Sequence, residues 1–275
     1  MKKNVIIIIL LLIIAGLIAF IAVDKRVVFH SEPPAADSAQ TDVKEETDSQ
    51  NSGESQNPPE QPLQNEYTVA IDPGHQSHGN SEKEAVGPGA SEMKAKVSSG
   101  TAGISTGTPE YKVNLQVSLK LKDELIKRGY NVIMTRETDD INISNSERAQ
   151  VANEAQAGAF VRIHCNGSDN HGVNGALTMC QTAGNPYCGQ IYAQSRKLSD
   201  CVLESLCKST GANSQGVIET DTMSGINWAM VPVTIVEMGY MTNPEEDKLL
   251  CSDEYQNKLA SGIADGIDAF FADKQ

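Results

Sequence analysis

From about residue 67 onward, the chain alternates short apolar runs with longer segments in which apolar residues recur at helical spacing. The short runs, which we predict to be β-strands, are residues 67–71, 130–135, 159–164, 173–180 and 231–237. The longer segments, which we predict to be mostly helical, are residues 110–129, 144–157, 187–210 and 253–271. Strands that alternate with helices indicate an α/β fold. We therefore expect a three-layer domain with a mixed, largely parallel sheet and helices on both of its faces.

Two of the predicted helices have recognisable start signals. Thr108 and Pro109 stand before Glu110 as N-cap and first helical residue, and Glu110 is an acid in the first turn, where the helix dipole favours it. Ser144, followed three residues later by Glu147, has the capping-box pattern. These signals place Glu110 at the start of the first long helix.

The N-terminal segment has the length and polarity of a membrane anchor. Residues 1–4 include two lysines, and residues 5–23 are an unbroken apolar run. Such a run crosses a bilayer of about 30 Å as a helix. It is longer than the apolar region of a usual signal peptide, about 7–15 residues, and no Ala-x-Ala cleavage pattern follows it. We predict an uncleaved single-pass anchor with residues 1–4 in the cytoplasm; the alternative is a cleaved signal peptide and a secreted protein.

Residues 24–66 differ sharply in composition from their neighbours. Between residues 31 and 66 there are nine acidic residues and one lysine, among many Pro, Ser, Gln and Asn. Because this composition cannot bury enough apolar surface to fold, we predict a disordered acidic stalk that carries one domain of ordinary size, residues 67–275, outside the cell. The net charge of −14 argues against a nucleic-acid partner.

Three of the predicted strands end in a side chain that can bind a metal ion. His75 follows the first strand after an Asp-Pro-Gly turn, and His164 and Glu237 close two later strands. In an open α/β sheet, functional sites are built at the carboxyl ends of the strands. With Glu110, these residues supply two imidazoles and one carboxylate for a three-ligand zinc site and leave a second carboxylate as general base. The pattern therefore predicts a zinc hydrolase.

Six short motifs contain or accompany these residues. In chain order they are Ile71-Asp-Pro-Gly-His75, Glu110-Tyr-Lys-Val-Asn114-Leu115, Val132-Ile-Met-Thr135-Arg136, Arg148-Ala-Gln-Val-Ala-Asn153, Arg162-Ile-His164-Cys-Asn166 and Val236-Glu237-Met-Gly239-Tyr-Met-Thr-Asn243. Over about residues 67–271 the set resembles the zinc-dependent N-acetylmuramoyl-L-alanine amidases of the type 3 catalytic class. The chain departs from the usual pattern at Tyr111, where Lys is usual, at Arg162, where Ser is common, and in a long insertion at residues 76–107.

The resemblance implies a peptidoglycan hydrolase that cleaves the amide between the lactyl group of N-acetylmuramic acid and the L-alanine of the stem peptide. It implies that His75, Glu110 and His164 bind Zn²⁺ and that Glu237 is the catalytic base. It also implies peptidoglycan as the partner, and we expect a monomer. Two other functions stay open, a zinc peptidase acting on cell-wall peptides and a catalytically idle wall-binding regulator.

Two further residues are candidates for substrate binding. Arg162 lies two residues before His164 and so on the same strand face, where it could bind a substrate carboxylate or pair with an acid. Asn166 closes the same motif. The Gly-, Ser- and Thr-rich insertion, residues 76–107, is typical of a lid or binding loop without secondary structure, and we expect it to line or cover the zinc cleft.

The six cysteines and the remaining histidines carry weaker indications. No Cys-x-x-Cys pair is present, so a cysteine zinc site is not expected. Cys180 and Cys188 flank a short loop that a disulfide could bridge, and free buried thiols are an equal alternative. We expect Cys165 in the core, His78 at the rim of the site and His171 in solvent.

The anchor prediction is tested by cell fractionation. Because the apolar run is long enough to span the bilayer, full-length protein should sediment with membranes, and protease added outside intact cells should digest its catalytic domain. A cytoplasmic protein that stays intact in the same cells is the control. Recovery of only a shorter, freely secreted form would show that the run is a cleaved signal peptide.

Overall fold

The computed structural model describes residues 66–272, all of which belong to one compact unit. The predicted anchor and nearly all of the predicted stalk, residues 1–65, lie outside the described residues. Among residues 66–272, no helix is long and apolar enough to cross a membrane. The membrane segment therefore stays a prediction.

Within the described part, six strands form the main sheet. They are β1 (Thr68–Pro73), β4 (Asn131–Met134), β5 (Ala159–Asn166), β6 (Ala176–Cys180), β7 (Ser214–Glu219) and β8 (Val233–Tyr240). Their order across the sheet is β4-β1-β5-β8-β6-β7. β4, β1, β5 and β8 are mutually parallel, β6 is antiparallel to β8, and β7 is parallel to β6. The prediction of a mixed, largely parallel sheet is confirmed.

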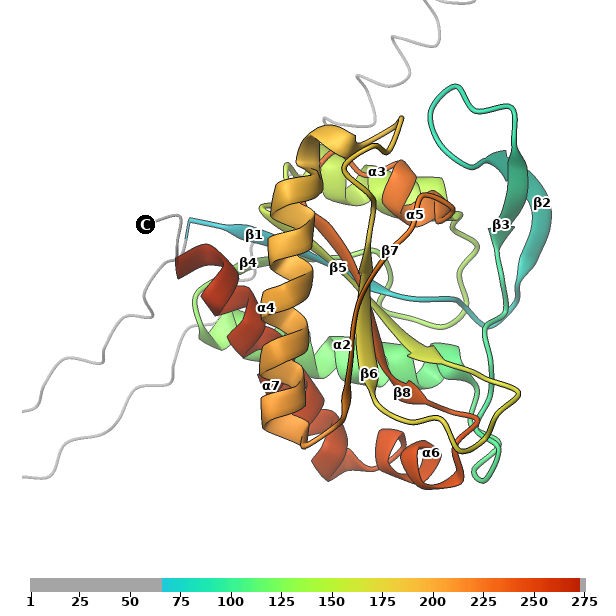
Figure 1. Cartoon of the computed structure of the whole chain (residues 1–275), viewed down its shortest axis with the longest axis vertical. Helices are drawn as coiled ribbons and strands as arrows, with labels where there is room; N and C mark the ends of the chain where they lie inside the picture. The colour runs from blue at the N-terminus through green and yellow to red at the C-terminus, as the bar shows by residue number, and fades with distance from the viewer. Residues whose placement is uncertain (1–65, 273–275) are drawn as a thin grey trace, which may run out of the picture. The chain divides into compact units, whose positions relative to one another are not determined.

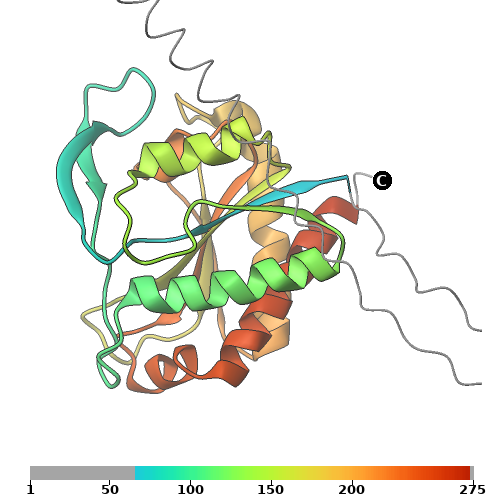
Figure 2. The same ribbon diagram turned by 180° about the vertical axis from the view of Figure 1, so that it is seen from behind.

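Helices lie on both sides of this sheet (Figures 1 and 2). They are α2 (Glu110–Lys127), α3 (Asn145–Glu154), α4 (Tyr192–Thr210), preceded by a 3₁₀ turn η1 (Gly189–Ile191), α5 (Ser224–Asn227), α6 (Pro244–Leu250) and α7 (Asp253–Ala272). α4 packs along α7, and α7 packs along α2. These three helices share one apolar core with the sheet, whereas α3 and α5 share a second core with its opposite face. The three-layer arrangement is therefore the predicted one.

Side-chain alternation along the central strands decides which residues can reach the functional site. On β5, Val161 and Ile163 point into the core beneath α2, α4 and α7, while Phe160 points into the core beneath α3 and α5. Because successive side chains on a strand point to opposite faces, Arg162 and His164 share the face of Phe160. Along β5, this face is apolar at Phe160 and polar at Arg162 and His164. Its polar end, at the carboxyl end of the strand, is therefore available for chemistry.

The insertion differs from the structureless loop expected from its composition. It contains an antiparallel hairpin of β2 (Asn80–Ala85) and β3 (Met93–Val97), which stands beside the main sheet in Figures 1 and 2. The indole N–H of Trp228 donates to the carbonyl of Ala85 (2.9 Å), and the amine of Lys94 donates to the carbonyl of Thr222 (2.6 Å). The hairpin strands were missed because they are mostly polar and are held by bonds to distant residues.

Other differences concern element ends and polar segments. α2 has Pro109, not Thr108, at its N-cap position, while the capping box of Ser144 and Glu147 is present as predicted. The edge strand β7 and the short helix α6 were not predicted from sequence. β7 is largely exposed and polar, so it has no apolar run of the kind that identifies a strand.

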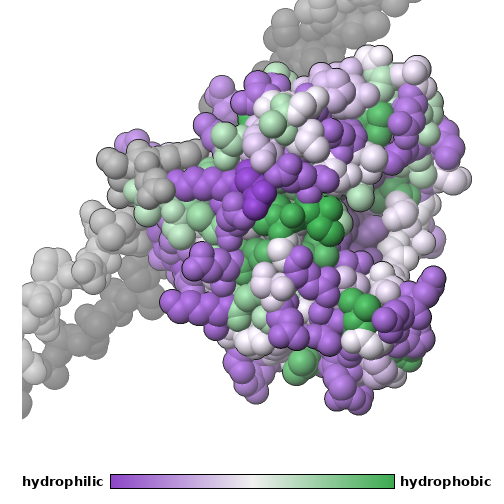
Figure 3. All heavy atoms as spheres, viewed as in Figure 1, coloured by the Kyte–Doolittle hydropathy of each residue, from purple (hydrophilic) through white to green (hydrophobic). Residues whose placement is uncertain are grey.

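The six cysteines lie in the described part, and none is in a disulfide. Cys180 and Cys188 are both buried and form no disulfide, so the bridge considered from sequence is absent. Cys165 lies in the core beneath α2, α4 and α7, as predicted. The face of the domain in Figure 3 is mainly polar, with its apolar side chains gathered mostly near the centre.

Candidate metal centre

Parallel pairing brings the predicted ligands to one edge of the sheet. On the paired strands β5 and β8, His164 stands directly opposite Glu237. β1 pairs with β5 on the other side, and the turn after Pro73 carries His75 to the same edge. α2 begins there as well, with Glu110 as its first residue. The four residues identified separately in the sequence are thus neighbours in space.

The donor atoms of His75, Glu110 and His164 converge. The Nε2 atom of His75 lies 3.1 Å and the Nδ1 atom of His164 3.3 Å from the same oxygen, Oε1 of Glu110. The two ring nitrogens are 3.1 Å apart. Donors that surround one zinc ion tetrahedrally, each at about 2.0–2.2 Å, are about 3.3 Å from one another. The three side chains therefore fit a single zinc ion, and no other such group occurs within residues 66–272.

The end of the insertion orients His75. Its Nδ1 atom lies 2.9 Å from the carbonyl oxygen of Ser98, so Nδ1 carries the proton and donates it to this carbonyl. Nε2 is consequently left with a free lone pair that faces Glu110. Such a carbonyl partner fixes the tautomer and the ring orientation of a metal-binding histidine. The insertion thus contributes to the ligand geometry.

Backbone and amide groups hold Glu110 in place. Its Oε2 atom accepts from the Thr101 amide (2.9 Å), and its Oε1 atom accepts from the Cys165 amide and the Asn114 side chain (3.1 Å each). Asn114 also donates to the carbonyl of Gly74 (3.2 Å) and so ties α2 to the turn that carries His75. Burial raises the pKa of Glu110, but the neighbouring His164 and His75 outweigh this effect and hold the pKa of this carboxyl well below its usual range.

Two backbone features explain the Asp-Pro-Gly-His sequence. A Cβ atom at Gly74 would lie 2.2 Å from the ring of His164, so only glycine lets the two ligands approach. His75 itself has φ of 60°, a conformation that costs a non-glycine residue of the order of 1–3 kcal/mol. The turn is therefore strained and needs support from its surroundings.

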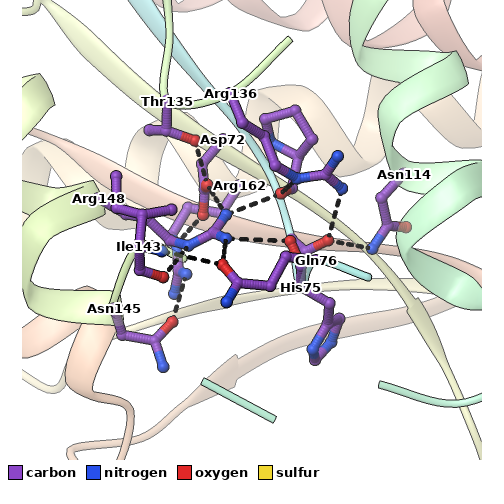
Figure 4. Close-up of polar contacts among 12 residues, drawn as sticks. Asp72, His75, Gln76, Asn114, Thr135, Arg136, Ile143, Asn145, Arg148 and Arg162 are labelled. Atoms are coloured by element: carbon purple, nitrogen blue, oxygen red, sulfur yellow. Dashed lines mark hydrogen bonds and ion pairs between the residues drawn. The ribbon is translucent and has the colours of Figure 1, made fainter. Parts of the chain in front are cut away.

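Buried polar side chains supply that support (Figure 4). The carboxylate of Asp72 has no solvent exposure and accepts from Arg148 Nη1 (2.7 Å), Arg162 Nε (2.8 Å) and the Thr135 hydroxyl. Burial alone would raise the pKa of Asp72, but the guanidinium groups of Arg148 and Arg162 hold it well below its usual range. Asp72 is therefore ionised in the folded protein.

The same arginines bind the backbone of the turn. Arg148 donates to the carbonyls of Pro73 (2.9 Å) and His75 (3.0 Å), and Arg136 donates to those of Pro73 (2.9 Å) and Gly74 (3.1 Å). Three successive carbonyl oxygens are thus held by two buried guanidinium groups (Figure 4). Sequence reasoning found Arg136 and Arg148 only as motif positions, because nothing local shows which distant carbonyl an arginine reaches.

A cavity of about 220 Å³ lies beside the three ligands. Glu237 and Arg162 line it with the two histidines, and Val97 and Ser98 of the insertion line it as well, as expected from sequence. Asn166 is not among the residues that line it, and its side-chain oxygen accepts from the amide of Gly167 (2.8 Å). A role for Asn166 in substrate binding stays a prediction.

The two other histidines of residues 66–272 lie outside this group. His78 is exposed, and its ring contacts the hydroxyl of Ser77 (3.0 Å). His171 is exposed too, as expected. Neither residue belongs to the convergent group.

Glu237 is the carboxylate left without a partner. Its Oε2 atom is buried and accepts no hydrogen bond within the described part of the chain. Burial and, to a smaller extent, the charge of Glu110 raise the pKa of Glu237 to about 8, although Arg162 opposes the change. Burial lowers the pKa of His164 to about 4, so this imidazole is neutral and able to bind a metal ion at pH 7. The group thus combines a ligand set with a buried carboxyl poised to accept or release a proton.

The chain matches a known protein family over nearly all of its described residues. The sequence profile of a family described as N-acetylmuramoyl-L-alanine amidase matches residues 69–269, which include all four residues of the centre.

Individual proteins show the same similarity. The chain is 33% identical over 168 residues to an uncharacterized protein of Bacillus subtilis, YqiI, covering 61% of this chain and 77% of that protein. It is 27% identical over 204 residues to the N-acetylmuramoyl-L-alanine amidase LytC of the same organism, covering 74% of this chain but 35% of that longer protein. The crystal structure of an N-acetylmuramyl-L-alanine amidase from Mycobacterium smegmatis is similar with a TM-score of 0.69 and 26% identity, over 76% of this chain and 98% of that one.

The convergence of the three donor atoms predicts a zinc site that requires all three ligands. The catalytic domain should bind about one zinc ion per chain, and His75→Ala, Glu110→Ala and His164→Ala should each lower the zinc affinity by more than the about 10–100-fold typical of a lost supporting contact. Zinc titration against a competing chelator measures this. His78→Ala is the control and should bind zinc normally. Full zinc occupancy in any of the three variants would remove that residue from the ligand set.

The raised pKa of Glu237 predicts a pH-dependent stability of the metal-free protein. Because the folded state holds this proton up to a pKa of about 8, against a usual 4.5, the stability it contributes is complete below pH 4.5 and is lost as the pH rises toward 8. Glu237→Gln, which stays neutral, should therefore gain in melting temperature over the wild type between pH 5 and pH 8 in the presence of a chelator. A difference that does not change with pH would contradict the raised pKa.

Proposed function

The chain belongs to the N-acetylmuramoyl-L-alanine amidase family, and we propose that it hydrolyses peptidoglycan with one zinc ion held by His75, Glu110 and His164. The bond cleaved is the amide between the lactyl group of N-acetylmuramic acid and the L-alanine of the stem peptide. The observation that carries the proposal is the convergence of three donor atoms, 3.1–3.3 Å apart, beside the unpartnered carboxyl of Glu237.

The donor set suits zinc. Two imidazoles and one carboxylate are a common ligand combination of catalytic zinc sites, which keep a further position for water or substrate. When bound, zinc polarises a carbonyl oxygen and brings the pKa of water down to about 7. The carbonyl of Ser98 and the side chain of Asn114 keep His75 and Glu110 oriented toward the ion.

Glu237 performs the proton transfers. Its carboxylate accepts a proton from the attacking water and returns it to the alanine nitrogen as the amide bond breaks. The charge of a divalent ion nearby favours the ionised carboxylate, so Glu237 is a base in the loaded enzyme although its pKa is raised without metal. Burial of the Oε2 atom keeps bulk water from competing for this proton.

The predicted anchor and stalk suit the same function. A catalytic domain held outside the membrane by an acidic, extended tether would reach the cell wall while staying attached to the cell. We therefore propose a single-pass membrane protein whose catalytic domain faces the wall.

Substitution of Glu237 separates catalysis from metal binding. Glu237→Gln keeps the size and polarity of the side chain but cannot accept a proton, so turnover should fall by about 10²–10⁴-fold, the usual contribution of a positioned acid–base group. Zinc content should stay at one per chain. Release of stem peptides from purified peptidoglycan, with quantification of new N-terminal alanine, measures the activity.

Each other outcome is informative. Loss of zinc from Glu237→Gln would make Glu237 a ligand, and retention of both zinc and activity would overturn its role as base. New amino termini other than alanine would identify a zinc peptidase instead of an amidase. Absence of any new end group with the wild type would favour an idle wall-binding protein.

A further inference from the structure

Arg162 is the only arginine or lysine among the residues that line the catalytic cavity. Its side chain is 4% exposed. Two of its three nitrogen atoms have acceptors: Nε donates to Asp72 (2.8 Å) and Nη2 donates to the side chain of Asn145 (2.9 Å). Within residues 66–272, the third nitrogen, Nη1, has no acceptor. A buried cation thus has one donor group left over, in a cavity that receives substrate.

Two neighbouring residues restrict the position of this guanidinium group. Its Cζ atom lies 5.9 Å from the centre of the Phe160 ring. A Cβ atom at Gly225 would lie 1.8 Å from Nη1 and 2.3 Å from Cζ, so the group occupies the space that the side chain of any larger residue would fill. The left-over donor is therefore held at a defined place in the cavity wall.

The surrounding charges favour an additional anion. Arg136, Arg148 and Arg162 are all buried around one fully buried carboxylate, Asp72, and the partly exposed Asp139 is the further acid that pairs with Arg136. The carboxylates of the metal centre would be offset by the divalent ion of the proposed function. The arginine cluster thus keeps an excess of positive charge. Met179, Met223 and Ile235 in the cavity wall keep the local dielectric low, which strengthens any ion pair formed there.

The spacing of Arg162 from the predicted ligand His164 along β5 indicates which substrate group can reach Arg162. Arg162 and His164 are two residues apart on the same strand face, and their Cα atoms are therefore about 6.6 Å apart. A residue of extended peptide spans about 3.3–3.6 Å. A substrate group that lies about as far from the scissile carbonyl as Arg162 lies from His164 therefore belongs to the residue after the alanine. In a stem peptide this residue is a glutamate linked through its side-chain carboxyl, and its α-carboxyl is either free or amidated.

We propose that Nη1 of Arg162 binds the free α-carboxylate of the stem-peptide residue that follows the alanine. The subsite therefore distinguishes free from amidated stem peptides. This inference rests on the proposed amidase function. Glycine at position 225 is part of the subsite, since it leaves room for the guanidinium group.

Two muropeptides that differ only in this carboxyl test the proposal with the wild-type zinc enzyme. The substrate with the free carboxylate should have a kcat/KM about 10–100-fold higher than the carboxamide, the effect of one charge-assisted hydrogen bond to a buried group. Equal values, or a preference for the carboxamide, would overturn the subsite and leave the amidase function intact. Cleavage of neither substrate would instead overturn the proposed function, and the subsite with it.

A glycine substitution tests the role of Arg162 without removing the charge that Asp72 needs. Gly225→Ala should displace the guanidinium group, so the ratio of the two kcat/KM values should fall toward one, chiefly through loss of the free-carboxylate substrate. Gly184→Ala is the matched control, because the nearest atom to its added Cβ is 3.8 Å away and the ratio should not change. Zinc content and melting temperature are measured on both variants. An unchanged ratio in a folded, zinc-loaded Gly225→Ala enzyme would exclude Arg162 as the carboxylate-binding residue.

Discussion

Asp72 keeps a full negative charge where no solvent reaches it, a state that is strongly unfavourable unless the charge is paired on every side. Arg148 and Arg162 provide the pairing, and Arg148 and Arg136 then bind the carbonyl groups of the turn that follows. Removal of one member of such a buried pair typically costs about 3–5 kcal/mol. This ion cluster is what holds the left-handed backbone of His75 in place, so the candidate metal centre depends on a charge that lies outside its ligand group.

The centre is built from groups that differ in how they are held. His164 and Glu237 lie on adjacent, hydrogen-bonded strands, and their positions follow directly from the register of the sheet. His75 and Glu110 lie on a turn and at a helix start, and each is positioned by hydrogen bonds to segments far away in sequence. In the proposed function, the rigid pair supplies a ligand and the base, while the supported pair completes the ligand set. For that function, small changes in the supporting loops are expected to affect metal binding before they affect the base.

Much of the fold and all four residues of the centre could be predicted from sequence, because both depend on patterns that are local. Apolar runs identified β1, β5 and β8, and His75, His164 and Glu237 follow from where those runs end. The hairpin β2–β3 and the edge strand β7 could not be found in this way, since their residues are polar and gain stability only from tertiary contacts. The partners of Arg136 and Arg148, about 60 to 75 residues away in the chain, were beyond reach for the same reason.

Ser98 and Thr101 belong to the insertion by sequence but to the metal centre by contact. The segment that shapes the cavity wall and the segment that orients two ligands are therefore one piece of backbone. Under the proposed function, a change in this piece that alters which substrate enters the cavity would also alter zinc binding, so substrate range and zinc affinity are coupled there. The tip of the hairpin, around the exposed Pro88 and Gly89, lies outside this coupling and is the part free to diverge.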